Sequence, residues 1–73
     1  MKPYSEKTNV TPYLQHGYKY VLLSQDAMYE LYCLDFFKTK KRAEHYNEEK
    51  MRNFGDVYTI RQAIKKFPFI IKS

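Results

Sequence analysis

A regular alternation of side chains begins at Tyr18 and continues to Leu23. Alternate residues of an extended chain project to opposite faces, so this run has the period of a β-strand. Both faces carry apolar side chains, because two tyrosines and a leucine fall on one face and a valine and a leucine on the other. Residues 24–27 follow as a mostly polar connection and predict a turn toward a second strand.

Residues 1–17, before this strand, sustain neither a helical nor a strand period for more than a few positions. The segment contains two prolines among Ser, Thr, Asn and Gln, a composition typical of irregular structure. Tyr13 and Leu14 are its best candidates for contact with the rest of the protein. We therefore predict an irregular N-terminal arm over residues 1–17 and a single small α+β domain over residues 18–73.

Residues 29–37 are rich in aromatic side chains and predict a second strand, which pairs with the first one as a β-hairpin. A helix is the alternative for residues 27–37, because three apolar residues of this segment also lie close to helical spacing behind Ser24, a possible N-cap. The aromatic enrichment and the nearby turn signal favour the strand.

The next element is predicted as a helix over residues 40–53, with Thr39 as its N-cap. Its apolar side chains lie within about 80° of one another at 100° per residue, which defines the buried side. Gly55 lies just past the last turn, where a left-handed residue commonly ends a helix. The predicted buried stripe consists of Ala43, Tyr46, Phe54 and, at its margin, Met51.

After the glycine turn, residues 57–60 predict a short third strand that extends the sheet of the hairpin. A helical signal starts inside it, because Thr59 and Gln62 have capping-box spacing and apolar residues then recur with helical period. We predict a short helix over residues 61–67, ended by the proline that follows, and an apolar tail over 69–71. The fold class is therefore α+β: a β-hairpin, an amphipathic helix (ββα), a short third strand and a short C-terminal helix.

The predicted hairpin has apolar side chains on both faces, although one helix can cover only one of them. The favoured cover for the second face is intramolecular, by the C-terminal helix and tail or by the N-terminal arm. A second copy of the protein or a bound partner is the alternative. A homodimer would explain such a face without identifying an activity.

Positive charge is concentrated in the second half of the chain. Residues 1–37 have three basic and four acidic side chains, and residues 38–73 have ten basic and four acidic ones. The densest group surrounds the predicted helix start, where the helix dipole favours acidic residues by about 0.3 to 1 kcal/mol each. Locally unfavourable choices of residue concentrate at functional sites, and a helix start flanked by lysines suits an anion such as phosphate.

The first functional hypothesis is a non-catalytic accessory protein that lays a basic helix face on the phosphates of nucleic acid, alone or within a nucleoprotein complex. It predicts weak sequence preference and strong salt dependence. A solvated helix face that serves solubility is the plain alternative for the same pattern. The candidate phosphate contacts are Lys38, Lys40, Lys41, Arg42 and Arg52, joined by Arg61, Lys65 and Lys66 from the last helix.

The eight tyrosines and five phenylalanines support a second hypothesis. A tyrosine ring buries area while its hydroxyl keeps a polar partner, which suits protein interfaces. The alternative function is a phage-type or mobile-element inhibitor or regulator that binds a host protein. An AT-rich genome would enrich these residues without any functional selection, because their codons are rich in A and T. The candidate protein-binding residues are Tyr18, Tyr20, Tyr29, Phe67 and Phe69.

The sequence contains no recognisable catalytic or metal-binding pattern. Cys33 is the only cysteine, which allows no internal disulfide, and we expect it to be a small buried hydrophobe. Neither His16 nor His45 has a nearby arrangement of nucleophile and base, and two glycines make no phosphate-binding loop. We expect no enzyme activity, cofactor or metal. Because no apolar run is long enough for a signal peptide or a membrane span, we expect a cytoplasmic protein without membrane contact.

Overall fold

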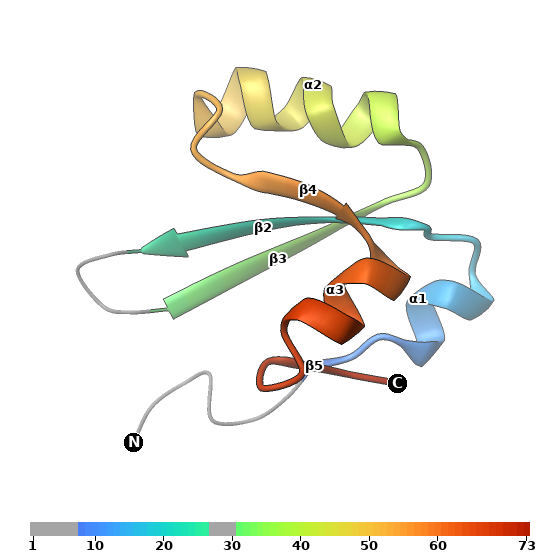
Figure 1. The fold of residues 1–73 in the computed structure, drawn as a ribbon. Helices are drawn as coiled ribbons and strands as arrows, with labels where there is room; N and C mark the ends of the chain where they lie inside the picture. Colours follow the sequence, from blue (N-terminus) through green and yellow to red (C-terminus); the bar gives the residue numbers. More distant parts are fainter. Residues whose placement is uncertain (1–7, 27–30) are drawn as a thin grey trace.

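The computed structural model describes residues 8–26 and 31–73 (Figure 1). Three helices and five strands lie within these residues, which confirms the predicted α+β fold class. In chain order the elements are β1 (Thr8–Asn9), α1 (Thr11–Gln15), β2 (Tyr20–Asp26), β3 (Leu31–Phe37), α2 (Lys40–Met51), β4 (Asp56–Thr59), α3 (Ile60–Lys66) and β5 (Ile71–Lys72).

Three strands form an antiparallel sheet in the order β3-β2-β4. β2 and β3 make the predicted hairpin, and a strand is confirmed over the helical alternative for residues 31–37. Residues 27–30 lie outside the described residues. Residues 24–26 belong to β2 and not to the predicted connection, because they pair with the start of β3. β4 is the predicted third strand, and it pairs with the other edge of β2.

The sheet is covered on both faces by segments of the same chain. α2 lies on one face, and α1, α3 and the parallel β1–β5 pair lie on the other (Figure 1). The predicted intramolecular cover is therefore confirmed, with the N-terminal segment and the C-terminal helix and tail all contributing. The core on this face consists of Val10, Val21, Leu23, Ile60, Ala63, Ile70 and Ile71.

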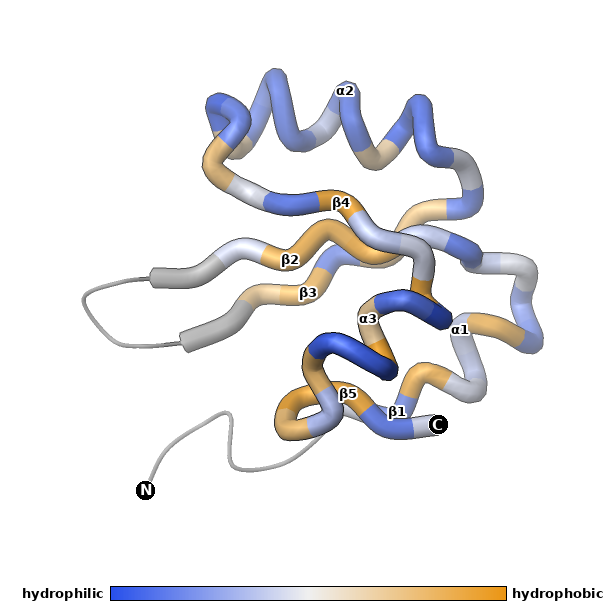
Figure 2. Tube along the Cα trace, in the orientation of Figure 1, coloured by the Kyte–Doolittle hydropathy of each residue, from blue (hydrophilic) through white to orange (hydrophobic). Residues whose placement is uncertain are grey.

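The core beneath α2 is smaller. Leu22 is fully buried there, and Ala43 is the one fully buried residue of α2. Figure 2 shows the reason, because α2 is hydrophilic along most of its length whereas the middle of β2 is hydrophobic. Tyr46 of α2 packs on Phe37 of β3, with ring centroids 5.3 Å apart. The flank of α2 along β3 is therefore partly open.

Residues 8–17 differ from the predicted irregular arm, because they contain β1 and α1. Val10, between the two elements, is completely buried. β1 forms through backbone pairing with β5, a distant partner that no local pattern reveals, and a proline fits the first turn of α1. The two predicted anchors are confirmed, because Leu14 packs on the core and the Tyr13 ring stacks on another aromatic ring.

The end of α2 also differs from the prediction. α2 ends at Met51, and the left-handed residues that follow it are Arg52 (φ 49°) and Asn53 (φ 65°). Gly55 is therefore not the left-handed residue that ends the helix. Phe54 is 83% exposed and does not join the buried stripe, because the turn breaks the helical period before it.

Both predicted N-caps are confirmed. The Thr39 hydroxyl accepts a hydrogen bond from the Arg42 backbone N–H at 3.2 Å. Thr59 and Gln62 form the reciprocal capping box, with both distances 3.1 Å. In residues 8–26 and 31–73, none of the helices has the length and apolar character that a membrane crossing requires.

Candidate functional site

The sheet gathers basic residues at one of its ends. β2 starts there, and β3 and β4 both finish there, because each pairs antiparallel with β2. The Lys19 N–H donates to the Phe37 carbonyl at 3.0 Å, and the Lys19 carbonyl accepts from the Ile60 N–H at 2.9 Å. Lys19, Lys38 and Arg61 therefore lie next to three neighbouring strand ends.

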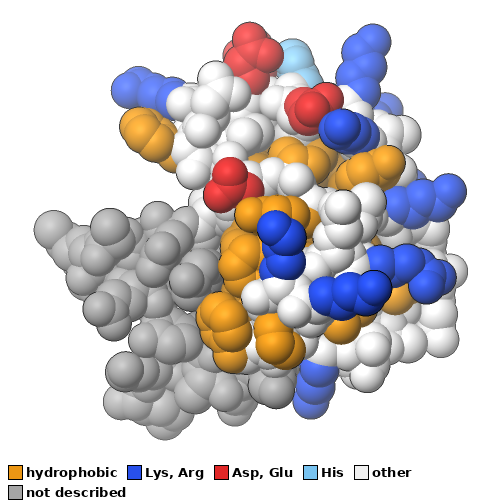
Figure 3. Space-filling view, viewed as in Figure 1, with side chains coloured by type: hydrophobic (Ala, Val, Ile, Leu, Met, Phe, Trp, Pro, Cys, Tyr) orange, Lys and Arg blue, Asp and Glu red, His pale blue; other side chains and the backbone are white. Residues whose placement is uncertain are grey.

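α2 starts at this same end and adds Lys41 and Arg42 from its first turn. The stretches that form this end, residues 16–20, 36–42 and 58–62, contain no Asp or Glu. In Figure 3, blue Lys and Arg side chains gather on the right, where this end of the sheet lies in Figure 1. We name the five exposed residues Lys19, Lys38, Lys41, Arg42 and Arg61 the basic sheet end.

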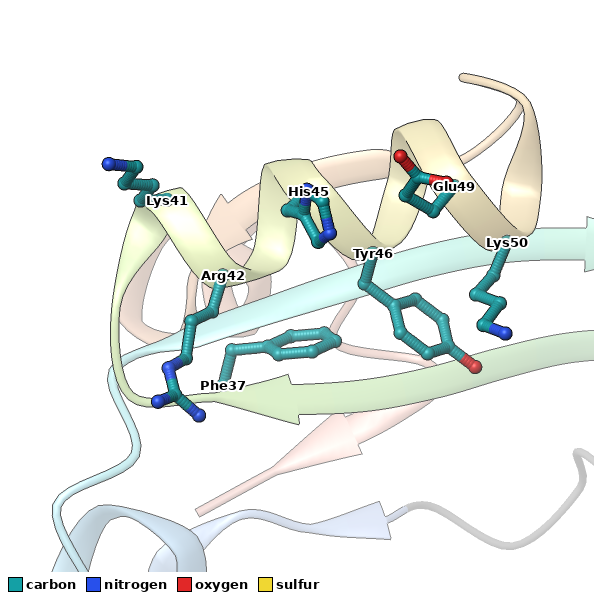
Figure 4. Close-up of a pocket in the computed structure, with 7 residues that line it drawn as sticks. All are labelled: Phe37, Lys41, Arg42, His45, Tyr46, Glu49 and Lys50. Atoms are coloured by element: carbon teal, nitrogen blue, oxygen red, sulfur yellow. The ribbon is translucent and has the colours of Figure 1, made fainter.

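A groove of about 580 Å³ runs between α2 and β3, which is an edge strand of the sheet (Figure 4). The rings of Phe37 and Tyr46 lie in it with their planes at 51°. Arg42 and Lys50 point toward β3 at opposite ends of this pair of rings. The residues that line this α2–β3 groove are Phe37, Lys41, Arg42, His45, Tyr46, Glu49 and Lys50.

A second hollow, of about 590 Å³, opens at the basic sheet end. It shares Phe37 and Arg42 with the α2–β3 groove, so the two form one continuous surface. Here the Lys38 ammonium lies 5.3 Å from the centroid of the Tyr18 ring, a cation–π contact. Both hollows are therefore lined by aromatic rings as well as cations.

The predicted phosphate contacts do not all lie together. Lys38, Lys41, Arg42 and Arg61 share the basic sheet end. Lys40 lies on the other flank of α2, in a hollow whose lining includes the carboxylates of Glu44, Glu48 and Asp56.

Three other predicted contacts lie farther away. Arg52 is the C-cap of α2, about 18 Å along the helix from its first turn. Lys65 and Lys66 belong to the last turn of α3, the helix whose first turn contains Arg61 (Figure 1). The Lys66 ammonium lies 5.4 Å from the centroid of the Tyr58 ring.

Four residues of this surface were not predicted as site residues: Lys19, Lys50, Phe37 and Tyr46, the last of which was expected in the buried stripe of the helix. The position of Lys19 in a strand pattern contains no signal for this site, because its approach to Lys38 depends on strand pairing. Lys50 had a signal, since it lies one turn after Tyr46 and two turns after Arg42 on the same flank of the helix.

The predicted protein-binding residues do not form one exposed face. Tyr18 and Phe67 are half-buried and pack against the core, and Tyr20 is also half-buried. Phe69 is 54% exposed, with its ring centroid 6.1 Å from that of Phe67. Tyr29 lies outside the described residues. Nothing in the described part of the chain favours a host-protein surface over the basic one, so that function stays a hypothesis.

Cys33 is exposed, which corrects the expectation of a buried residue. It lies on β3, whose position at the edge of the sheet leaves one side uncovered. Among the residues that the structure describes, no cluster of three His, Cys, Asp or Glu side chains could hold a metal ion. Comparisons with protein-family models, curated proteins and solved structures find no significant match to the chain.

Proposed function

We propose that this protein is a non-catalytic nucleic-acid-binding protein, acting alone or within a nucleoprotein complex, and that its basic sheet end contacts phosphates. The observation that carries the proposal is the convergence of five exposed cations from three distant segments, without an acidic residue in those segments. Lys and Arg contacts to phosphate position a protein on nucleic acid but do not read sequence. We therefore expect weak sequence preference.

The local electrostatics favour an anion at this surface. α2 begins there, so the positive end of its dipole adds to the field of the side chains. The same dipole makes Lys41 and Arg42 unfavourable in the free protein, and a bound phosphate would offset that cost. A phosphate ligand explains why cations stand where acidic residues would stabilise the helix.

Binding through phosphate contacts is expected to weaken by a calculable factor as the salt concentration rises. Each phosphate contact lowers the slope of log affinity against log salt by about 0.7 for a single strand and about 0.9 for a duplex. Five contacts predict roughly 100- to 500-fold weaker binding at about 200 mM than at about 50 mM salt.

Fluorescence anisotropy with labelled single-stranded and duplex oligonucleotides, repeated over this salt range, tests the proposal. The double variant Lys41→Glu with Arg42→Glu is expected to weaken binding at least about tenfold and to flatten the slope by about 1.4 to 1.8. The matched control, Lys66→Glu with Lys72→Glu, makes the same change in net charge at exposed positions of α3 and β5, and Lys66 lies on a different flank of α3 from Arg61. It is expected to change affinity by at most about threefold.

Two results would contradict the proposal. Equal losses in the two double variants would mean that net charge attracts the polymer without a defined surface. No binding of any oligonucleotide at the lowest salt would exclude the proposed function and leave the host-protein hypothesis.

A further inference from the structure

The α2–β3 groove holds two aromatic rings between two cations. Phe37 and Tyr46 lie between Arg42 and Lys50 in Figure 4. Arg42 and Lys50 are about 12 Å apart along the helix axis, at a rise of about 1.5 Å per residue. Successive nucleotides of a stacked strand rise about 3.4 Å, so the two cations span about three or four nucleotides.

The two rings of the groove both keep part of their surface exposed. Phe37 and Tyr46 are half-buried, and their planes are tilted by 51°, so the two rings do not stack flat on each other. Tyr13 and Phe36 provide the contrast within this chain, because they stack 3.8 Å apart with planes at 13° and cover each other. The groove therefore suits a third flat ring.

We infer that the α2–β3 groove takes unpaired bases of single-stranded nucleic acid, whose backbone continues onto the basic sheet end. The inference rests on the proposed function and deepens it by naming the substrate class. Bases stack on aromatic side chains with little regard to sequence, while neighbouring cations follow the backbone. The bases of a duplex are paired and stacked, so a ring in a groove reaches a base face only after the base leaves the helix.

The charge and continuity of the groove fit this occupant. Its lining includes Lys41, Arg42 and Lys50 against the single carboxylate of Glu49. Arg42 also lines the hollow at the basic sheet end, so a strand can pass from one to the other while it stays on the protein. An acidic peptide would meet the same cations but has no row of flat rings to stack on Phe37 and Tyr46.

A Tyr46→Trp variant reports directly on stacking, because the chain contains no other tryptophan. It is titrated at about 50 mM salt with oligo(dT), oligo(U) and a duplex, each of about twelve nucleotides. We expect either single strand to quench the emission and the duplex to leave it nearly unchanged. Phe67→Trp is the matched control, because Phe67 is also half-buried and also follows a lysine, Lys66, but packs against the core on the other face of the sheet, outside the stretches that form the basic sheet end. Its emission is expected to stay constant.

Affinity measurements on two Tyr46 variants distinguish stacking on the aromatic ring from simple apolar packing. Tyr46→Phe keeps the ring and is expected to bind single strands within about twofold of the parent. Tyr46→Leu removes the ring but keeps an apolar side chain, and it is expected to lose about tenfold or more for single strands and little for the duplex. Circular dichroism melts confirm that each variant is folded.

The outcomes distinguish the inference from the proposed function. If single strands bind with a steep salt slope while Tyr46→Leu binds normally and Tyr46→Trp emission stays constant, the inference is wrong and the proposed function stands. If no oligonucleotide binds, both are wrong. If polyglutamate quenches Tyr46→Trp as strongly as the oligonucleotides do, the groove recognises acidic chains and the inference is overturned.

Discussion

The side-chain amide of Asn47 in α2 pairs with both backbone groups of Gly55, just before β4. Asn47 Nδ2 donates to the Gly55 carbonyl at 2.9 Å, and Asn47 Oδ1 accepts from the Gly55 N–H at 2.9 Å. Gly55 is buried, and buried backbone groups need such partners. The pair therefore fixes the chain where it leaves the helix and enters the sheet.

Asn47→Ala is expected to lower the free energy of unfolding by about 1 to 3 kcal/mol, because it leaves two buried backbone groups unpaired. Urea unfolding followed by circular dichroism measures the change. Glu44→Ala, at an exposed position of the same helix, is the control and is expected to change stability by less than about 0.5 kcal/mol. Equal midpoints for the two variants would contradict the role of Asn47.

Gly55→Ala is expected to destabilise the protein by about 1 to 3 kcal/mol through crowding. A Cβ at this position would lie 2.6 Å from Cδ1 of the fully buried Leu22. Leu22→Val removes atoms from the crowded side chain, so the double variant is expected to lose less stability than the two single losses added together. A double-mutant cycle from urea unfolding measures this coupling. Strictly additive losses would mean that the destabilisation by Gly55→Ala does not come from crowding of Leu22.

Thr39 connects folding to the candidate site, because it caps α2 and lines the hollow at the basic sheet end. Thr39→Asp is expected to keep stability or raise it by up to about 1 kcal/mol, since aspartate caps well and suits the positive end of the helix. The same negative charge beside Lys38 and Arg42 is expected to weaken oligonucleotide binding by about fivefold or more.

Thr39→Asn is the neutral control for this variant, because asparagine caps a helix without adding charge. Thermal melts and anisotropy titrations on the same preparations compare the two. Unchanged binding by Thr39→Asp would exclude this hollow from the interface.

Several elements were predictable because their signals are local. Thr39 and the Thr59–Gln62 pair identified helix starts, since a cap joins residues three positions apart. The end of α2 was not predictable in this way, because the chain must turn toward β4 and bond to Asn47 across the turn. The sequence pattern predicts a left-handed backbone at Gly55. In the structure, glycine is needed there because a Cβ would lie too close to the Leu22 side chain.

Val10→Ala tests whether the N-terminal segment belongs to the core. The variant is expected to lower the free energy of unfolding by about 2 kcal/mol, because it deletes two fully buried methyl groups. Gln15→Ala, at an exposed position of α1, is the control. If urea unfolding gives both variants the parent's midpoint, the segment contributes nothing to stability.

Most of the candidate site was predictable from the positive charge of the predicted helices, including Arg61 of the last helix. Lys38, Lys41 and Arg42 could be found from charge density alone. Lys19 reaches the same end of the sheet only through the antiparallel pairing of β2 with β3. Arg52 resembles them in charge, although it lies at the far end of α2, so similar charge in the sequence does not mean proximity in the fold.

Thr8 in β1 pairs with Ile71 in β5, so the layer on the α3 side closes only when two distant segments meet. Closing such a long loop costs more entropy than closing the β2–β3 hairpin, whose strands are neighbours along the chain. We expect the hairpin to form early and the β1–β5 pair to form late. During synthesis, Val10 leaves the ribosome well before Ile70 and Ile71 have been added. Val10 therefore cannot complete its core packing until these last residues have also left the ribosome.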